Sequence, residues 1–310
     1  MTQDTLIITD VAPRDGLQNQ RVAVPTEAKL ELIRLLHAAG VASIEATSFV
    51  SPKAVPQMAD AAELMAAVHR QLPELRASAL VPNLKGLERA HAAGVREVAV
   101  VLSATETMNQ KNINMGLAQA TTVCVDTLHA ARQRGLRTRA YVAVAFDCPF
   151  EGRTPLETVV RLAARMDEAG ADEIVIADTI GSAAPGMVQT HFRALAQAVP
   201  PRKLAAHFHD TRGLAAANAW AAILAGVRRF DASVGGIGGC PFAPGAAGNA
   251  ATEDLVLMAE GSGLATGISL PGLLHAVAYA ESRLGRELGG RSSAWLRRQY
   301  ASRDRTAATN

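Results

Sequence analysis

Residues 37–47 read HAAGVASIEAT, a helix ending that leads directly into a β-rich run. The same Ala-Gly ending, followed by a small apolar residue, recurs at 91–96 (HAAGVR), 167–172 (DEAGAD) and 224–229 (LAGVRR). A glycine at this position supplies the left-handed backbone that closes a helix before the next element. The repeated ending therefore predicts a chain that alternates helices with strands.

Eight such units can be placed along the chain. Strands are expected over 6–10, 43–47, 76–81, 97–103, 139–145, 173–178, 204–209 and 229–234, and helices over 26–39, 58–71, 84–93, 118–134, 155–169, 185–199, 214–225 and 250–261. Alternating units produce a parallel α/β sheet, and eight of them fit a closed (β/α)8 TIM barrel. A doubly wound open sheet is the alternative, although no Gly-x-Gly-x-x-Gly follows the first strand. We predict one catalytic barrel domain over 1–288, with an extra C-terminal helix over 271–288, and a flexible tail over 289–310.

Composition excludes several classes of protein. The net charge is +2 without a basic block, which argues against a nucleic-acid partner. No apolar run reaches about 18 residues, and the N-terminus lacks a signal-peptide layout, so no membrane segment is expected. Cys124, Cys148 and Cys240 are odd in number and widely spread, which predicts free thiols and a cytoplasmic protein.

Polar residues gather where the predicted strands end, which is where a TIM barrel carries its chemistry. Apolar strands ending in charged groups are not explained by core formation, because burying an unpartnered charge is costly. These residues are Arg14 and Asp15 after the first strand, Glu45 in the second, Asp178 in the sixth, His207 and His209 in the seventh, and Cys240 and Asn249 after the eighth.

His207 and His209 lie two residues apart, so in a strand both imidazoles face the same side. An isolated His-x-His can equally be a packing pair. Together with Asp15 and Asn249, however, the pair forms a mixed nitrogen and oxygen set that suits Mg²⁺, Mn²⁺ or Co²⁺ better than Zn²⁺.

Arg14 and Cys240 supply two further groups. Arg14 is either part of a surface turn or a fixed guanidinium that stabilises a developing oxyanion. Cys240 stands among glycines and before Pro241, in a segment expected to move, where a thiol could deliver a proton and withdraw.

Taken together, these stretches resemble the 3-hydroxy-3-methylglutaryl-CoA (HMG-CoA) lyases of the DRE-TIM metallolyase group. The matching stretches are PRDGLQN, EATSFVSPKAVPQM, VPNLKG, KNIN, CPFEG, DTIG, HFHDT and GGIGGCPFAPGAAGNAATEDLV, in order between residues 7 and 263. The resemblance implies a TIM barrel that binds Mg²⁺ or Mn²⁺ and takes an acyl-CoA at the C-terminal face.

The resemblance also implies roles for individual residues. Asp15, His207, His209 and Asn249 correspond to metal ligands, and Arg14 to the group that polarises the thioester carbonyl. Cys240 corresponds to the thiol of the mobile loop, and Glu45 and Asp178 to acids that orient the metal and substrate. Gln18, Ser48, Lys111, Asn112 and Thr179 correspond to substrate-binding positions.

The implied reaction is a retro-Claisen cleavage that yields acetyl-CoA and acetoacetate. Asp15 or His207 takes the C3 hydroxyl proton, Arg14 stabilises the enolate, and Cys240 protonates it. The Ala-rich helix faces are compatible with a homodimer.

The sequence departs from the family pattern at several positions. Arg212 stands where Tyr is usual, Val175 for Ser, Ala177 for Gly, Phe242 for Tyr and Ala247 for Ser. Loss of a hydroxyl alters selectivity more than chemistry. A related substrate, such as citramalyl-CoA or an HMG-CoA with a longer C3 chain, is therefore an alternative. A Claisen condensation enzyme of the isopropylmalate synthase type and a barrel that binds acyl-CoA without turnover are two competing hypotheses.

Overall fold

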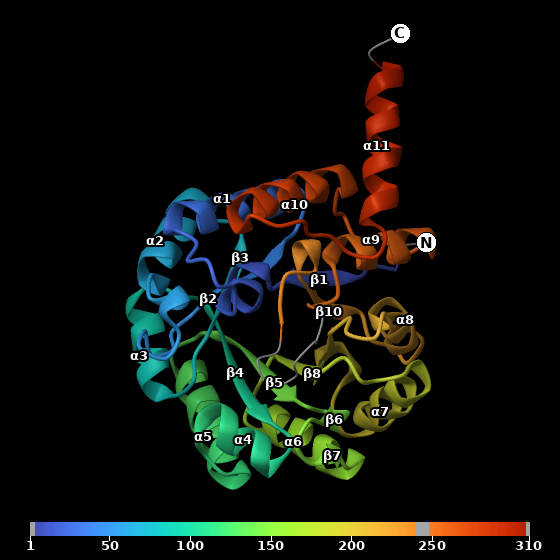
Figure 1. The fold of residues 1–310 in the computed structure, drawn as a ribbon. Coiled ribbons are helices and arrows are strands. Elements are labelled where there is room, and N and C mark those ends of the chain that lie inside the picture. Colours follow the sequence, from blue (N-terminus) through green and yellow to red (C-terminus); the bar gives the residue numbers. More distant parts are fainter. Residues whose placement is uncertain (1–3, 240–247, 308–310) are drawn as a thin grey trace.

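The computed structural model describes residues 4–239 and 248–307. Within them, parallel strands close into a barrel in the order β1-β10-β9-β8-β5-β4-β3-β2, and β1 pairs with both β10 and β2 (Figure 1). The strands are β1 (Ile7–Asp10), β2 (Ser43–Ser48), β3 (Arg76–Leu80), β4 (Glu97–Ser103), β5 (Arg137–Ala143), β8 (Glu173–Asp178), β9 (Leu204–Phe208) and β10 (Arg229–Ala232). The predicted TIM barrel is confirmed.

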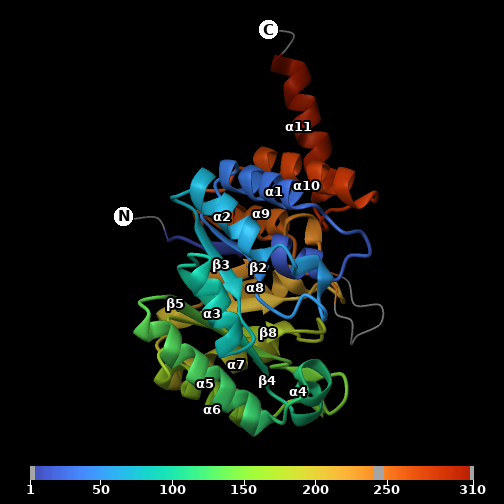
Figure 2. The ribbon, with the colours of Figure 1, turned by 90° about the vertical axis from the view of Figure 1, so that its left-hand side faces the viewer.

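Helices form a ring around the outside of this barrel (Figures 1 and 2). They are α1 (Thr26–Ala38), α2 (Ala61–Gln71), α3 (Leu84–Ala92), α5 (Leu117–Gln133), α6 (Leu156–Glu168), α7 (Pro185–Ala198), α8 (Ala215–Leu224), α9 (Thr252–Gly261) and α10 (Leu270–Leu284). Their apolar faces pack on the outward side chains of the strands in one continuous core.

The Ala-Gly endings behave as expected. The φ angles are 99° at Gly40, 77° at Gly94, 90° at Gly170 and 98° at Gly226, all in the left-handed region. A Cβ at Gly40 would also lie 2.3 Å from the carbonyl oxygen of Gly267. This glycine is thus required both by the turn and by the close approach of the chain before α10.

Two elements were not expected from the sequence. Helix α4 (Glu106–Ile113) has little apolar periodicity, because it reads ETMNQKNI. The short hairpin of β6 (Asp147–Cys148) and β7 (Gly152–Arg153) follows β5. Both elements stand beside the C-terminal end of the barrel, where loops carry function.

The tail that we expected to be flexible contains helix α11 (Ser293–Ala307), which projects away from the barrel (Figure 1). Its start, including the two residues before it, is anchored by long-range contacts that composition does not reveal. Leu296 is buried, and the Asp254 carboxylate accepts hydrogen bonds from the backbone N–H groups of Arg291 and Ser292 at 2.7 and 2.9 Å. None of the helices in the described ranges is both long and apolar enough to span a bilayer.

Candidate active site and metal centre

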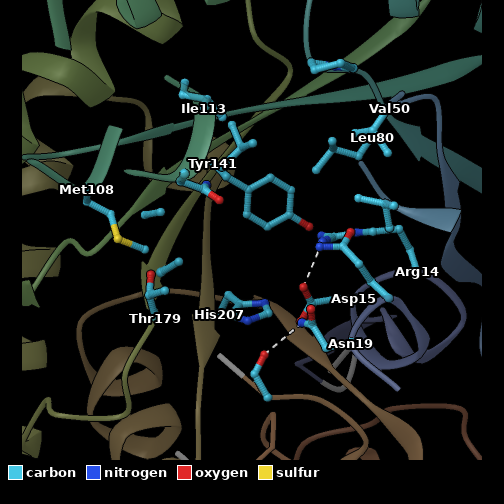
Figure 3. A pocket seen from close by; sticks show the side chains of 18 of the residues that line it. Arg14, Asp15, Asn19, Val50, Leu80, Met108, Ile113, Tyr141, Thr179 and His207 are labelled. Atoms are coloured by element: carbon cyan, nitrogen blue, oxygen red, sulfur yellow. Dashed lines mark hydrogen bonds and ion pairs between the residues drawn. The ribbon is translucent and has the colours of Figure 1, made fainter. Parts of the chain in front are cut away.

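A cavity of about 290 Å³ opens where the strands of the barrel end (Figure 3). One side is polar and the other is apolar. The polar side chains are Arg14, Asp15, Gln18, Asn19, Asn112, Tyr141, Thr179, His207 and His209, and the apolar ones include Val50, Val55, Leu80, Pro82, Val101, Met108 and Ile113. The cavity can therefore hold a ligand with one charged end and one apolar end.

The polar side brings together three predicted metal ligands. Asp15 lies in η1, a π-helical turn (Ala12–Gly16) that follows β1, while His207 lies in β9 and His209 directly follows that strand. One ligand atom from each residue can be chosen so that all three atoms lie within 4.8 Å of one another. Both histidines are nearly fully buried.

Asn249 completes this group and provides a test of whether it fits a metal. Its Nδ2 donates to Asp15 Oδ2 at 2.8 Å and to the carbonyl of Ile237 at 3.2 Å. Its Oδ1 is buried and finds no donor among the described residues. A buried oxygen in that condition, beside a carboxylate and two imidazoles, is a donor set that fits a divalent cation.

Arg14 lies between two carboxylates. Its Nε and Nη2 both contact Glu45 Oε2, and its Nη1 donates to Asp15 Oδ1 at 2.8 Å. Burial alone would raise the pKa of Asp15, but the charges of Arg14 and of the two histidines outweigh burial and lower it. At Glu45, burial outweighs Arg14 and raises the pKa. The site therefore favours the ionised form of the Asp15 carboxyl.

Three important residues were missed by the sequence reading, which considered mainly strand ends. Asp231 of β10 accepts hydrogen bonds from Arg139 Nη2 at 2.6 Å and from the Tyr141 hydroxyl at 2.7 Å. Its Oδ2 lies 3.3 Å from His207 Nδ1. The Tyr141 ring lies between Arg14 and His207, with centroid distances of 6.0 Å to Arg14 Cζ and 6.2 Å to the imidazole (Figure 3).

The remaining predicted residues separate into two groups. Gln18, Asn112 and Thr179 line the cavity. Glu45, Ser48 and Asp178 are buried outside the described lining, and Asp178 accepts hydrogen bonds from the backbone N–H groups of Ser182 and Ala183. Burial raises the pKa of Asp178 in spite of these donors.

Lys111 also stays outside the described lining. It lies on α4, with Nζ 5.1 Å from the centroid of the Phe150 ring. Asp178 and Lys111 are thus placed to hold the loops around the cavity rather than to line it.

Cys240, Phe242 and Ala247 lie outside the described residues. The residue before Cys240 is described, however. Gly239 lines the cavity, and its carbonyl accepts a hydrogen bond from Asn19 Nδ2 at 3.1 Å. The last described residue before Cys240 therefore lies at the site.

The departures from the family pattern have different surroundings. Val175 is fully buried inside the barrel, where it packs with Ala99, Tyr141 and Ala205, so it supports the Tyr141 ring from outside the cavity. Ala177 does line the cavity. The exposed Arg212 donates to the carbonyl of Ser182 at 3.2 Å.

Comparison with known proteins shows similarity in both sequence and fold. Residues 5–279 match the HMGL-like family model. The chain is 43% identical over 285 residues to hydroxymethylglutaryl-CoA lyase of Bacillus subtilis, covering 92% of this chain and 95% of that protein.

Two further relatives bear on the ligand. The chain is 42% identical over 286 residues to the 3-hydroxy-3-isohexenylglutaryl-CoA/hydroxymethylglutaryl-CoA lyase of Pseudomonas aeruginosa, covering 92% of this chain and 95% of that one. A solved structure of an HMG-CoA lyase from Acinetobacter baumannii, in complex with coenzyme A and 3-methylmalate, superposes with a TM-score of 0.89 at 39% identity. That match covers 95% of this chain and 96% of the other.

Proposed function

The chain belongs to the HMGL-like family and is a carbon–carbon lyase, and on that premise we propose that it cleaves HMG-CoA to acetyl-CoA and acetoacetate with Mg²⁺ or Mn²⁺. The observation that carries the proposal is the meeting of Asp15, His207 and His209 in one cavity with Arg14. Such a cleavage needs a Lewis acid, a base, an oxyanion partner and a proton donor. Among the residues of the described cavity, Asp15, His207 and His209 could hold the Lewis acid, Asp15 could act as the base, and Arg14 could stabilise the oxyanion.

Asp15, His207, His209 and Asn249 Oδ1 would hold the metal. A divalent cation held there would supply a Lewis acid that lowers the pKa of the C3 hydroxyl. Asp15 suits the set because the Arg14 guanidinium, which donates to its Oδ1 at 2.8 Å, favours the ionised carboxyl despite burial.

We assign removal of the hydroxyl proton to Asp15. An ionised carboxylate has about four lone-pair sites, so it can serve as ligand and acceptor together. His207 offers the cavity a single nitrogen, because its Nδ1 faces Asp231. That nitrogen cannot both bind a cation and accept a proton.

The C2–C3 bond then breaks. Its electron pair goes to C2 and the thioester carbonyl as the enolate of acetyl-CoA, while C3 becomes the ketone carbon of acetoacetate. Arg14 is positioned to stabilise that enolate oxygen, because contacts to Glu45 and Asp15 fix its guanidinium in the cavity wall. Cys240 donates its proton to C2, which completes acetyl-CoA. Asp15 then releases the hydroxyl proton to solvent, and the Cys240 thiolate takes up a proton from solvent.

The substrate contacts follow from the cavity lining. Gln18, Asn112 and Thr179 line the cavity and would offer hydrogen bonds to the acyl group and pantetheine. Ser48, Lys111 and Asp178 lie outside that lining and would act through the residues around it. The apolar side of the cavity favours a second substrate, an HMG-CoA analogue with a longer apolar C3 substituent. Citramalyl-CoA has no apolar extension and gains nothing from that side.

We also propose that the protein works in the cytoplasm, which is supported by free, buried thiols at Cys124 and Cys148. The relatives described above are named as lyases, which argues against the hypothesis of a condensation enzyme.

The test is to incubate the purified protein with Mg²⁺ or Mn²⁺ and HMG-CoA, citramalyl-CoA or a long-chain C3 analogue, and to follow acetyl-CoA by mass spectrometry. His207→Ala is the blank, and Lys85→Ala, a surface change on α3, is the matched control. Metal-dependent release of acetyl-CoA and acetoacetate supports the proposal. Absence of cleavage of every thioester, with the metal bound, refutes it.

A further inference from the structure

We propose that Asp231 is a positioning residue, which fixes the tautomer and orientation of His207 so that His207 Nε2 faces the metal position. The proposal rests on the metal site of the proposed function, but its first readout requires neither metal nor substrate. Nothing in the sequence motifs pointed to Asp231, which stands in the middle of the eighth predicted strand.

The contacts define which nitrogen of His207 carries the proton. Asp231 Oδ2 lies 3.3 Å from His207 Nδ1. An ionised carboxylate only accepts hydrogen bonds, so Nδ1 must be the protonated nitrogen. The lone pair of the neutral ring then belongs to Nε2, on the opposite side of the imidazole. An imidazole that binds a metal is commonly oriented by a carboxylate in this way.

Asp231 is itself held firmly. It is buried, and Arg139 Nη2 donates to its Oδ1 at 2.6 Å. The same Arg139 pairs with Glu173 through Nε at 2.7 Å and through Nη2 at 2.6 Å. Glu173, Arg139 and Asp231 form an ionic column inside the barrel that ends at His207. The barrel interior thus carries charged side chains where packed apolar layers are usual.

The column explains why Asp231 stays ionised in a buried place. Burial opposes its charge, but Arg139 Nη2 donates to its Oδ1 at 2.6 Å and the Tyr141 hydroxyl donates to its Oδ2 at 2.7 Å. The carboxylate therefore remains an acceptor for His207 Nδ1–H. An ion pair that only stabilised the barrel would not need to contact a predicted metal ligand.

Asp231→Asn separates positioning from packing. Asparagine has nearly the same shape, but one oxygen becomes an NH₂ group. Arg139 demands an acceptor at Oδ1, so the NH₂ group falls at the Oδ2 position, opposite His207, and the Tyr141 hydroxyl turns from donor to acceptor there. The favoured His207 tautomer then becomes Nε2–H, which has no lone pair for a metal. Arg139 keeps its pair with Glu173, so no buried charge is left unpartnered.

The experiment uses the full chain labelled with ¹⁵N-histidine, stripped of metal and studied above the titration range of its imidazoles. Two-bond ¹H–¹⁵N spectra report the tautomer, and His207→Gln assigns the His207 signals. We expect Nδ1–H in the wild type and Nε2–H in Asp231→Asn. Calorimetric titration with Mn²⁺ should show a Kd weakened about 10–100-fold in this variant.

Glu97→Gln is the matched control. Glu97 is another buried carboxylate on a barrel strand, and it is paired with Arg76 at 2.6 and 2.8 Å rather than with a ligand. Its variant should keep the wild-type tautomer and Kd. If Asp231→Asn does not fold, the spectrum of the wild type decides alone, because Nε2–H at His207 in the wild type overturns the proposal.

An unchanged His207 tautomer or an unchanged Mn²⁺ Kd in Asp231→Asn overturns the proposal. If the protein cleaves none of the thioesters while the tautomer and Kd change as expected, the proposed substrate is wrong and the role of Asp231 stands.

Discussion

Asp10 joins the two loops that frame the site, and its replacement by asparagine gives a prediction with a definite sign. The buried carboxylate accepts hydrogen bonds from Ala12 N at 2.9 Å, Val234 N at 2.9 Å and Thr252 Oγ1 at 2.7 Å. Ala12 begins the turn that carries Arg14 and Asp15. Val234 begins the turn that leads to Gly239.

Burial raises the pKa of Asp10 to about 7, although the three donors oppose the shift. The ordinary value is 3.8, so the folded protein binds a proton that the unfolded chain has released over that interval. The contribution of Asp10 to the free energy of unfolding is therefore fully present below pH 3.8 and is lost as the pH rises towards about 7. The total loss is about 4 kcal/mol, of which about 3 kcal/mol falls between pH 5 and 8.

Asp10→Asn removes this pH dependence and adds a constant loss. Its NH₂ group must face one backbone N–H, either of Ala12 or of Val234, which costs about 1–3 kcal/mol. We expect the variant to be less stable than the wild type at pH 5 and to approach or exceed it at pH 8.

Urea unfolding followed by circular dichroism at pH 5, 6, 7 and 8 measures both proteins. The difference in unfolding free energy should move by about 3 kcal/mol in favour of the variant between pH 5 and 8. Parallel pH profiles would refute the reasoning, because they would mean that the three donors keep Asp10 ionised throughout.

Three further predictions concern the site. Arg14→Gln should lower kcat about 10²–10³-fold with little change in KM. Arg14→Lys should not restore kcat, because one ammonium cannot contact Glu45 and Asp15 as the guanidinium does. In steady-state assays, a KM effect without a kcat effect would contradict the oxyanion role. Asn249→Ala should weaken Mn²⁺ binding at least about 10-fold by calorimetry, since it removes a ligand oxygen and the donor to Asp15, and an unchanged Kd would exclude Asn249 from the ligand set. Removal of the metal by a chelator should abolish turnover but leave the barrel folded. Mn²⁺ at 100 times its Kd should raise the unfolding free energy by about 2.7 kcal/mol. Unfolding of the chelated protein would show that the metal is structural.

Much of the architecture could be predicted because it depends on local patterns. Helix endings at Gly40 and Gly94 require a left-handed backbone, and that requirement is visible in the sequence. The meeting of Asp15, His207 and His209 could be predicted because parallel strands bring strand ends that are distant in the sequence to one edge. Helix α11 was not predicted, because it is anchored by Asp254 through contacts that have no local pattern.

The supporting residues escaped for a different reason. Arg139, Glu173 and Asp231 lie within strands, at positions where a reading based on strand ends does not look. Yet successive side chains of a strand alternate between the barrel interior and the helices. In the eighth strand, Phe230 and Ala232 join the outer core, while Asp231 turns inward between them.

That alternation makes the interior of a catalytic barrel partly readable from sequence. A charged residue that faces inward on a barrel strand must find a partner there, because an unpaired buried charge is costly. Arg139, Glu173 and Asp231 satisfy that demand among themselves, and the chain of contacts ends at His207. The alternation that assigns Phe230 and Ala232 to the outer core therefore also assigns Asp231 to the interior, where its contacts lead to the site.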